Sequence, residues 1–100
     1  MAKKVLLACA AGLSTSMMVQ KMQEAAKKIG LEYEIWAQPV SKAISLVNEV
    51  DFVLLGPQVR FELGRFQKAS TGTPVEVIDM RAYGTMNGEL VINTIKDKIK

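Results

Sequence analysis

The residues best suited to chemistry lie together near the start of the chain. Cys9, the only cysteine among 100 residues, follows the apolar run 5–8, and Gly12 and the hydroxyl residues 14–16 come soon after it. Small residues allow the backbone to wrap closely around a bound group, and the amides of such a loop and of a first helical turn can bind an anion. Amides in this arrangement stabilise a thiolate and would also hold a phosphoryl group carried on its sulfur. The alternative is a small buried thiol followed by ordinary helix caps.

The residue types that the chain lacks narrow this chemistry. There is no histidine, so neither a Cys-His nor a Ser-His pair can form, and one thiol with carboxylates alone is a poor zinc site. The small tyrosine phosphatases have a strand-loop-helix of the same kind. Its sequence is a cysteine, then five residues, then an arginine, and then a serine or threonine. Here Thr15 stands at the arginine position and Ser16 at the hydroxyl position. Because arginine stabilises the phosphoryl group during hydrolysis, its absence favours a cysteine that keeps a phosphoryl group until another acceptor arrives.

Other classes of protein stay open at this point. A low-molecular-weight phosphatase-like enzyme would share the loop, and an arsenate-reductase-like enzyme would share the thiol but would need a resolving cysteine. A flavin or nucleotide binding module would use the same kind of loop without needing Cys9. A purely structural interaction domain predicts that alkylation of Cys9 changes nothing.

The apolar pattern that must position Cys9 alternates between strands and helices. Four short runs predict strands, at 4–9, 31–37, 51–55 and 75–78. Helices are predicted at 14–29, in a short segment capped by Ser41, from Pro57 onward, and from near Asn87. The first helix is predicted to carry Met18, Met22, Ala25 and Ile29 on one apolar face and to stop at Gly30. The last is predicted to carry Leu90, Ile92, Ile95 and Ile99 on its apolar face. The order is β-α-β-α-β-α-β-α, which predicts one α/β domain with a four-stranded parallel sheet and helices on both faces.

The strands also indicate their places in the sheet. The first and third are apolar throughout, as in strands buried on both faces, whereas the second and fourth alternate with Glu32, Glu34 and Glu76, as at an edge. Right-handed crossovers then give the order 2-1-3-4. Ligands of open α/β sheets bind at the carboxyl ends of the strands where the chain reverses. The loop after Cys9 meets the segment Gly56-Pro57-Gln58 at that place.

Three more side chains are candidates for this site. Gln58 could donate to a phosphoryl group, with a solvent-facing helix-start residue as the alternative. Asp79 ends the fourth strand and is expected to cap a following turn rather than to act as a general acid. Tyr83 lies in the predicted loop after it, where it either borders the site or is an ordinary exposed tyrosine.

The composition fits a domain of a reducing compartment. The chain is 49% hydrophobic with a net charge of +3, and no apolar run approaches the roughly 20 residues of a membrane span. No secretory signal pattern is present. Lysines gather at the two ends rather than in a basic stripe interleaved with aromatics, which disfavours nucleic acid. We therefore expect a cytoplasmic protein with no metal, no cofactor, no membrane insertion and no nucleic-acid partner.

Three stretches, in the same order, carry a resemblance to a known family. CAAGLSTSMMVQKM, DFVLLGPQ and PVEVIDMRAYGTMNG resemble the IIB component of the lactose/cellobiose/chitobiose branch of the bacterial sugar phosphotransferase system (PTS). The resemblance covers essentially the whole chain. It implies that residues 1–100 form one PTS EIIB type domain, whose architecture is close to that of the small tyrosine phosphatases.

The resemblance also implies roles for residues and partners. Cys9 would accept a phosphoryl group from a phosphohistidine of the IIA component. It would donate that group to a sugar such as cellobiose, chitobiose or lactose during uptake through the membrane component IIC, which would recruit the chain to the inner face of the membrane. Phosphate binding would fall to the residues that follow the cysteine: Ala10, Ala11, Gly12, Leu13, Ser14, Thr15, Ser16 and Met17.

Transfer between proteins requires that a partner can reach the sulfur. Leu13 and Met17 flank the hydroxyl run, and a solvent-facing methionine is an adaptable contact. Phe61 falls opposite the apolar stripe of the third helix, although a scattered surface aromatic is the alternative. Arg60 would steer an acidic partner. We therefore expect both partners to use the Cys9 side of the domain.

Overall fold

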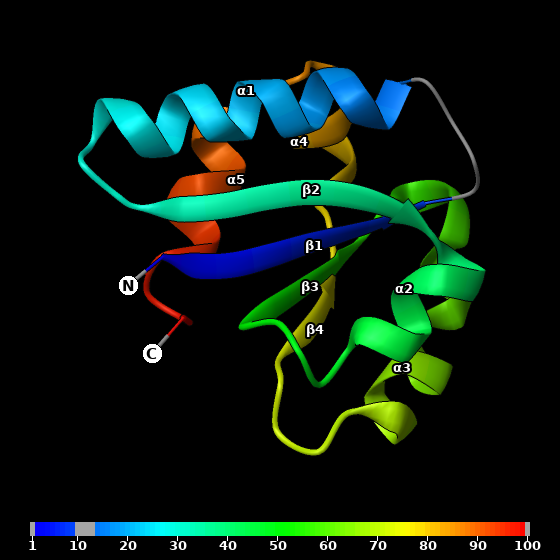
Figure 1. The fold of residues 1–100 in the computed structure, drawn as a ribbon. Coiled ribbons are helices and arrows are strands. Elements are labelled where there is room, and N and C mark those ends of the chain that lie inside the picture. Colours follow the sequence, from blue (N-terminus) through cyan, green and yellow to red (C-terminus); the bar gives the residue numbers. More distant parts are fainter. Residues whose placement is uncertain (1, 10–13, 100) are drawn as a thin grey trace.

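A parallel sheet with helices on both faces organises the computed structural model, which describes residues 2–9 and 14–99 (Figure 1). The strands are β1 (Lys3–Cys9), β2 (Tyr33–Pro39), β3 (Phe52–Leu55) and β4 (Val75–Val77). The helices are α1 (Ser14–Lys28), α2 (Val40–Leu46), the 3-10 helix η1 (Pro57–Glu62), α3 (Leu63–Ala69), α4 (Met80–Gly84) and α5 (Gly88–Ile95).

The strands lie in the order β2-β1-β3-β4, and every neighbouring pair is parallel. Val5 of β1 lies opposite Ile35 of β2 on one side and Phe52 of β3 on the other. The predicted strand order is therefore confirmed. All four residues of β3 are buried, whereas the edge strands expose part of their length, as the apolar and alternating patterns predict.

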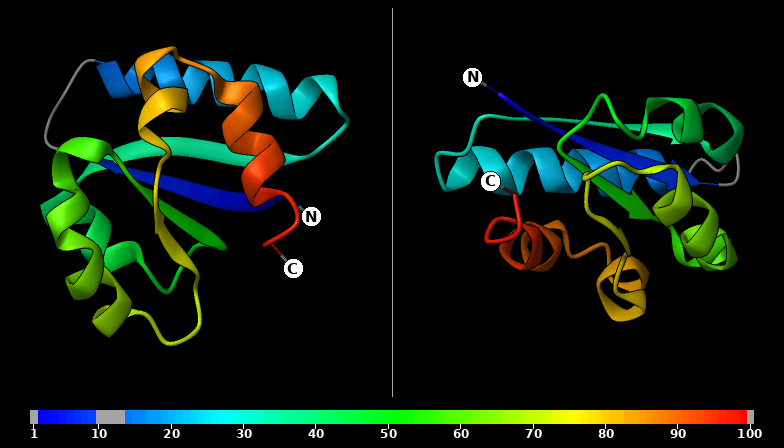
Figure 2. Two further views of the ribbon diagram at one scale, coloured as in Figure 1. Left: turned by 180° about the vertical axis from the view of Figure 1, so that it is seen from behind. Right: turned by 90° about the horizontal axis from the view of Figure 1, so that it is seen from below.

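Two separate hydrophobic cores lie on the two faces of the sheet. Because side chains alternate along a strand, Val5 and Leu7 of β1 join one core and Leu6 and Ala8 join the other. The first core packs under α1, α4 and α5, and the second packs under α2, η1 and α3 (Figures 1 and 2). Among the described residues, no helix combines the length and the apolar character needed to cross a bilayer.

Helix α1 ends as predicted at Gly30 but buries a different residue. Gly30 has φ 78°, its amide donates to the Lys27 carbonyl, and the Leu31 amide donates to the Ala26 carbonyl. These two bonds form a Schellman cap, in which the residue after the glycine packs back on the helix. Leu31 accordingly packs against the first core. The expectation that Ile29 lies on the buried face is wrong, because the chain turns at the cap and leaves Ile29 exposed.

Three other helix predictions need correction. Ser41 does not cap α2: the helix begins at Val40, because β2 runs on to Pro39, which stands at the N-cap position. The helix after β3 does start at Pro57, but as a 3-10 helix that continues into α3 only at Leu63. Leu90 of α5 is exposed rather than on the buried stripe.

The segment after β4 differs most from the prediction. The sequence pattern predicts a loop there, whereas the segment contains the short helix α4. The carboxylate of Asp79 accepts a hydrogen bond from the Ala82 amide at 3.2 Å, which caps the first turn of that helix. The capping role expected for Asp79 is thus confirmed, and what it caps is a helix rather than a turn.

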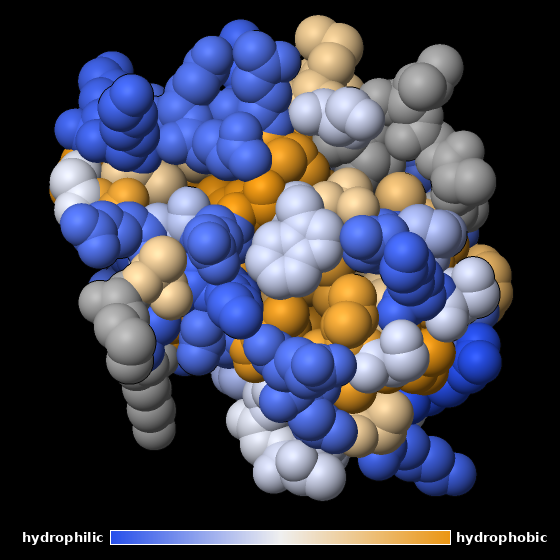
Figure 3. Space-filling model, in the orientation of Figure 1, coloured by the Kyte–Doolittle hydropathy of each residue, from blue (hydrophilic) through white to orange (hydrophobic). Residues whose placement is uncertain are grey.

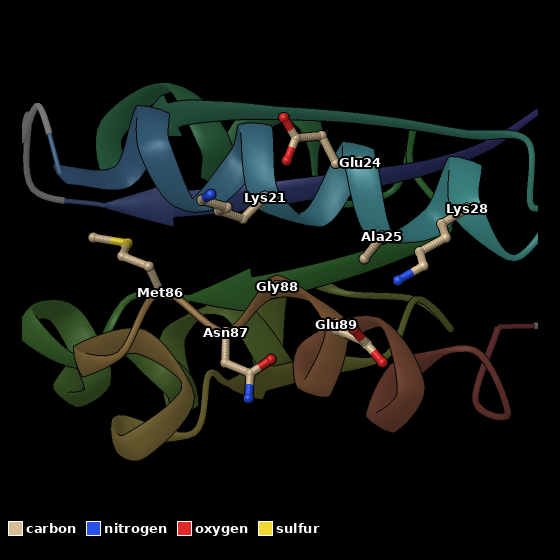
Figure 4. A pocket seen from close by; sticks show the side chains of 8 residues that line it. All are labelled: Lys21, Glu24, Ala25, Lys28, Met86, Asn87, Gly88 and Glu89. Carbon is tan, nitrogen blue, oxygen red and sulfur yellow. The ribbon is translucent and has the colours of Figure 1, made fainter.

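Helices α1 and α5 approach each other closely at Gly88, the first residue of α5. A Cβ built on Gly88 would lie 2.4 Å from the carbonyl carbon of Lys21 and 2.5 Å from the amide nitrogen of Met22. Figure 4 shows Gly88 directly beneath the middle of α1. Only a residue without a Cβ fits this approach, so Gly88 sets the spacing of the two helices that cover the first core.

Candidate functional site

The thiol of Cys9 lies at the carboxyl end of β1, the central strand nearest the β2 edge. The residue is 5% exposed, and its Sγ lies 3.8 Å from the backbone carbonyl oxygen of Gln38, to which the thiol donates. Gln38 belongs to the neighbouring strand β2, whose register places Pro39 opposite Cys9. The sulfur is therefore held at the edge of the sheet where parallel α/β proteins bind ligands.

The segment predicted to bind phosphate is only partly described. Ala10, Ala11, Gly12 and Leu13 lie outside the described residues. The rest of the segment, 14–17, forms the first turn of α1, which contains no acidic residue. The side chains of Ser16 and Met17 are exposed. The end of β1 and the amino end of a 15-residue helix thus flank the predicted loop, and such a helix end favours an anion.

A second segment reaches Cys9 from β3. The amide of Gly56, just past β3, donates to the Ala8 carbonyl at 2.8 Å. A Cβ built on Gly56 would lie 4.0 Å from Cys9 Cβ and 3.0 Å from the side-chain oxygen Oε1 of Gln58. The side-chain oxygen of Gln58 therefore lies close to Gly56, although the residue as a whole is exposed. Cys9 and Gly56 thus lie near each other at the predicted edge, and the loop after Cys9 lies outside the described residues.

Tyr83 joins the same site from α4. Its ring is buried in the first core, and its hydroxyl accepts a hydrogen bond from Gln58 Nε2 at 3.3 Å. The alternative of an ordinary exposed loop tyrosine is wrong, because α4 turns the ring inward, under α1 and α5. Asp79 stands at the opposite end of this helix, exposed, with its carboxylate on the Ala82 amide.

Three large apolar side chains are exposed around this end of the sheet. Met17 is 55% exposed, Phe61 76% and Met80 61%. Each follows the carboxyl end of a different strand: β1, β3 and β4. The exposure predicted for Met17 and Phe61 is confirmed, whereas Met80 was not predicted. Aspartate is a favoured N-cap residue, so Asp79 directly after the fourth predicted strand is the sequence signal for a helix start there. That signal could have revealed α4 and, with it, Met80.

Basic residues are next in sequence to two of these three exposed apolar residues. Arg60 precedes Phe61 on η1, and Arg81 follows Met80 on α4, and both are exposed. The described part of the chain contains no cluster of three or more His, Cys, Asp and Glu side chains that could hold a metal ion. The described residues around the Cys9 edge thus include a thiol, exposed apolar side chains and two exposed arginines.

Two hollows of the described surface involve helix α1. One, of about 270 Å³, lies between α1 and the start of α5 and is lined by two lysines, two glutamates and their neighbours: Lys21, Glu24, Ala25, Lys28, Met86, Asn87, Gly88 and Glu89 (Figure 4). Another, of about 600 Å³, runs along β2 beneath α1, where apolar atoms show between hydrophilic ones (Figure 3). Neither of these two hollows is lined by Cys9, Gln58, Asp79 or Tyr83.

The architecture is thus an α/β protein with a parallel sheet covered on both faces and a thiol at the carboxyl edge of that sheet. Residues 4–94 match the family model described as "PTS system, Lactose/Cellobiose specific IIB subunit". The chain belongs to this family and is thus a IIB component of a sugar phosphotransferase system. The family resemblance read from the three sequence stretches is confirmed.

Relatives with different sugar names are about equally similar. The oligo-beta-mannoside-specific EIIB component of Bacillus subtilis is 48% identical, over 87% of this chain and 86% of the relative. The galactose-specific and cellobiose-specific EIIB components of two Lactococcus lactis subspecies are each 44% identical, over 92% of this chain and 93% of the relative.

Solved structures agree with the fold. The cellobiose-specific IIB component of Borrelia burgdorferi superposes with a TM-score of 0.73 at 38% identity, covering 100% of this chain and 97% of the other. The lactose-specific IIB domain of Streptococcus pneumoniae gives a TM-score of 0.86 over 97% of both chains, at 15% identity. This second likeness shows the shared fold alone.

Proposed function

We propose that Cys9 carries a phosphoryl group between a IIA component and a sugar. One observation carries the proposal: the single thiol of a IIB-family chain ends β1 at the carboxyl edge of the sheet, with α1 beginning five residues later. This is the edge at which α/β sheets bind ligands. A thiol there can be reached by a donor from one side and supported by a helix amino end from the other.

The transfer balances in two steps. The Cys9 thiolate attacks the phosphorus of a IIA phosphohistidine, the S–P bond forms, the P–N bond breaks, and the imidazole leaves with the electron pair and takes up a proton. A hydroxyl of the sugar then attacks the same phosphorus, its proton passes to solvent or a nearby base, and the S–P bond breaks to return the thiolate. The chain needs no cofactor and no metal for either step.

The residues after Cys9 hold the phosphoryl group in this proposal, from Ala10 to Met17. A phosphoryl group brings about −1.5 to −2 charges. The amino end of α1 opposes that charge, and its first turn adds no carboxylate to repel it. Thr15 stands where the small phosphatases have arginine, so the site binds the group without the arginine that stabilises its hydrolysis.

The exposed apolar residues at this edge support a docking surface shared by both partners. Met17, Phe61 and Met80 are exposed around the Cys9 end, and Arg60 and Arg81 place positive charge beside two of them. Such a surface fits an acidic partner with an apolar contact region. IIA and the membrane component IIC would then take turns on one face, with IIC holding the chain at the inner side of the membrane.

The sugar is proposed to be a β-linked disaccharide such as cellobiose, chitobiose or lactose. The family model supports this class by its lactose/cellobiose description. The relatives at 44–48% identity carry different sugar names, so choice within the class depends on something other than overall similarity of this component. Selection of the sugar by the membrane component IIC would account for the different sugar names at similar identity.

Phosphotransfer followed by intact mass tests the proposal. Incubation with a phosphorylated IIA component should add one phosphoryl group to the chain, and Cys9→Ser should abolish transfer to sugar. Mock incubation with unphosphorylated IIA is the control. Labelling of another side chain with sugar transfer intact would refute the assignment. Steady turnover of an aryl phosphate, lost in Cys9→Ser, would move the chain to the hydrolases.

Chemical-shift mapping with IIA tests the docking surface. We expect the amide signals of Met17, Phe61 and Met80 to move most. Changes centred on residues 96–99, with these three unmoved, would rule the surface out.

A further inference from the structure

Asn87 and Gly88, at the start of α5, form the one Asn-Gly pair in the sequence. Asparagine before glycine is the pair most prone to deamidation, because no side chain on the second residue hinders the backbone nitrogen that attacks the asparagine. The other asparagines, Asn48 and Asn93, are followed by a glutamate and a threonine. Asn87 is also exposed to water. The sequence thus singles out Asn87 for this reaction.

The reaction balances with water as the co-reactant. The backbone nitrogen of Gly88 gives its proton to a solvent base and attacks Asn87 Cγ, and the new C–N bond closes a succinimide ring. The bond from Cγ to the side-chain nitrogen breaks, and that nitrogen takes up a proton and leaves as ammonia. Water then opens the ring at either carbonyl carbon. The products are aspartate and isoaspartate, in which the main chain runs through Cγ.

The folded backbone holds the reacting atoms apart. Ring closure needs the Gly88 nitrogen on the same side as Asn87 Cβ about the Cα–C bond of Asn87. Because Cα is tetrahedral with L chirality, the observed ψ of 77° places that nitrogen nearly opposite Cβ. The required rotation would carry the Asn87 carbonyl oxygen away from the Val91 amide, which donates to it at 3.3 Å. It would also disturb the cap, in which the Leu90 amide donates to Asn87 Oδ1 at 3.0 Å. Ring closure is therefore incompatible with the first turn of α5.

Packing prevents this rotation while α5 lies on α1. The Gly88 backbone lies against Lys21 and Met22 with no room for a Cβ, and Figure 4 shows the Asn87 side chain directed away from α1. The Gly88 amide also donates to the Met86 carbonyl at 3.1 Å. Met86 itself has φ 52°, in the left-handed region that residues with a Cβ rarely adopt, so opening of this junction releases strain. The start of α5 is closed to the reaction until it leaves α1.

We infer that Asn87 is a modification site that becomes reactive only when α5 opens. The aspartate product can fold back, because aspartate is as good an N-cap as asparagine and its charge suits a helix start. Isoaspartate lengthens the main chain directly before Gly88, where even one Cβ has no room, so α5 cannot pack back on α1. The reaction thus converts a transient opening of α5 into a lasting one, independently of the chemistry proposed for Cys9.

Peptide mass mapping of the whole chain tests the site. In urea at mildly alkaline pH, Asn87 should deamidate before Asn48 and Asn93, which are internal controls. In native buffer the rate at Asn87 should fall by at least about 10-fold, because the reaction follows the population of the open state. An Asn87 no faster than the two controls in urea would overturn the site. Equal rates at Asn87 in urea and in native buffer would overturn its closure by the fold.

Two buried valines separate opening of α5 from unfolding of the whole chain. Val91 of α5 lies in the first core, and Val53 of β3 lies in the second. Val91→Ala should raise the rate at Asn87 in native buffer by roughly 10-fold. Val53→Ala should raise it much less, and neither variant should change the rate in urea. Equal acceleration by the two variants would mean that only global unfolding exposes Asn87, and would refute control by α5.

Urea unfolding of the separated products tests the consequence for packing. Asn87→Asp reproduces one product directly and should unfold at the same urea concentration as the wild type. Chains that contain isoaspartate should unfold at a lower concentration. Equal midpoints for the two products would refute the claim that isoaspartate prevents α5 from packing on α1.

Discussion

Because α1 and α5 approach closely at Gly88, one methyl group added there should destabilise the chain more than at any other described glycine. In Gly88→Ala the new Cβ would lie 2.4 Å from the Lys21 carbonyl carbon, 2.5 Å from the Met22 amide nitrogen and 2.6 Å from the Lys21 carbonyl oxygen. Carbon atoms in contact lie about 3.5–4.0 Å apart, so α5 must move by roughly 1 Å. The atoms are backbone and cannot rotate aside. We expect a loss of about 1–3 kcal/mol of unfolding free energy, the range for overpacked cores.

Urea unfolding followed by the fluorescence of Trp36 measures this loss. Trp36 is the only tryptophan and packs against the second core, so its signal reports the whole domain. Each kcal/mol corresponds to a fall of about 4–8 °C in Tm for a domain of this size. Gly64→Ala is the matched control: Gly64 lies within α3 with no atom near a built Cβ, so alanine should stabilise by about 0.5–1 kcal/mol. A Gly88→Ala variant as stable as wild type would refute the packing argument.

Two further predictions concern Asp79 and Tyr33. Asp79→Ala should lower the unfolding free energy measured in urea by about 0.5–2 kcal/mol, because the hydrogen bond that caps the Ala82 amide is lost. Asp79→Asn should keep most of that stability, because asparagine is also a good N-cap. Equal losses in the two variants would contradict a capping role. Burial, and then the Asp97 carboxylate, raise the pKa of Tyr33 above its ordinary 10.0. The unfolded chain therefore ionises first, and the contribution of Tyr33 to stability is intact below pH 10 and lost as pH rises past that value. Tyr33→Phe should flatten this alkaline decline between pH 9 and 11, and an unchanged slope would disprove it.

The sheet was predictable because its strands differ strongly in pattern. A strand buried on both faces must be apolar throughout, as β3 is, and an edge strand can alternate, as β2 does. Parallel crossovers then leave few arrangements. The same rules located the Cys9 and Gly56 segments at one edge, since they fix where the carboxyl ends of the strands lie.

The features that could not be predicted from the sequence share a physical reason: short segments take their structure from packing. The five residues of α4 are too few for a periodic apolar stripe, so only the Asp79 cap signalled them. The bond between Gln58 and Tyr83 joins residues 25 positions apart and depends on how α4 packs against the first core. Ile29 was misplaced because the Schellman cap, and not the helical period, decides which residue after α1 returns to the core.

The three exposed apolar residues at the Cys9 edge are far apart in the sequence. Met17, Phe61 and Met80 each follow a different one of the neighbouring strands β1, β3 and β4, so no short peptide from this chain can present all three. A protein that binds this surface recognises the folded chain and ignores the unfolded one. By mass action such a protein also stabilises the fold, so the chain should resist unfolding best when its partners are abundant.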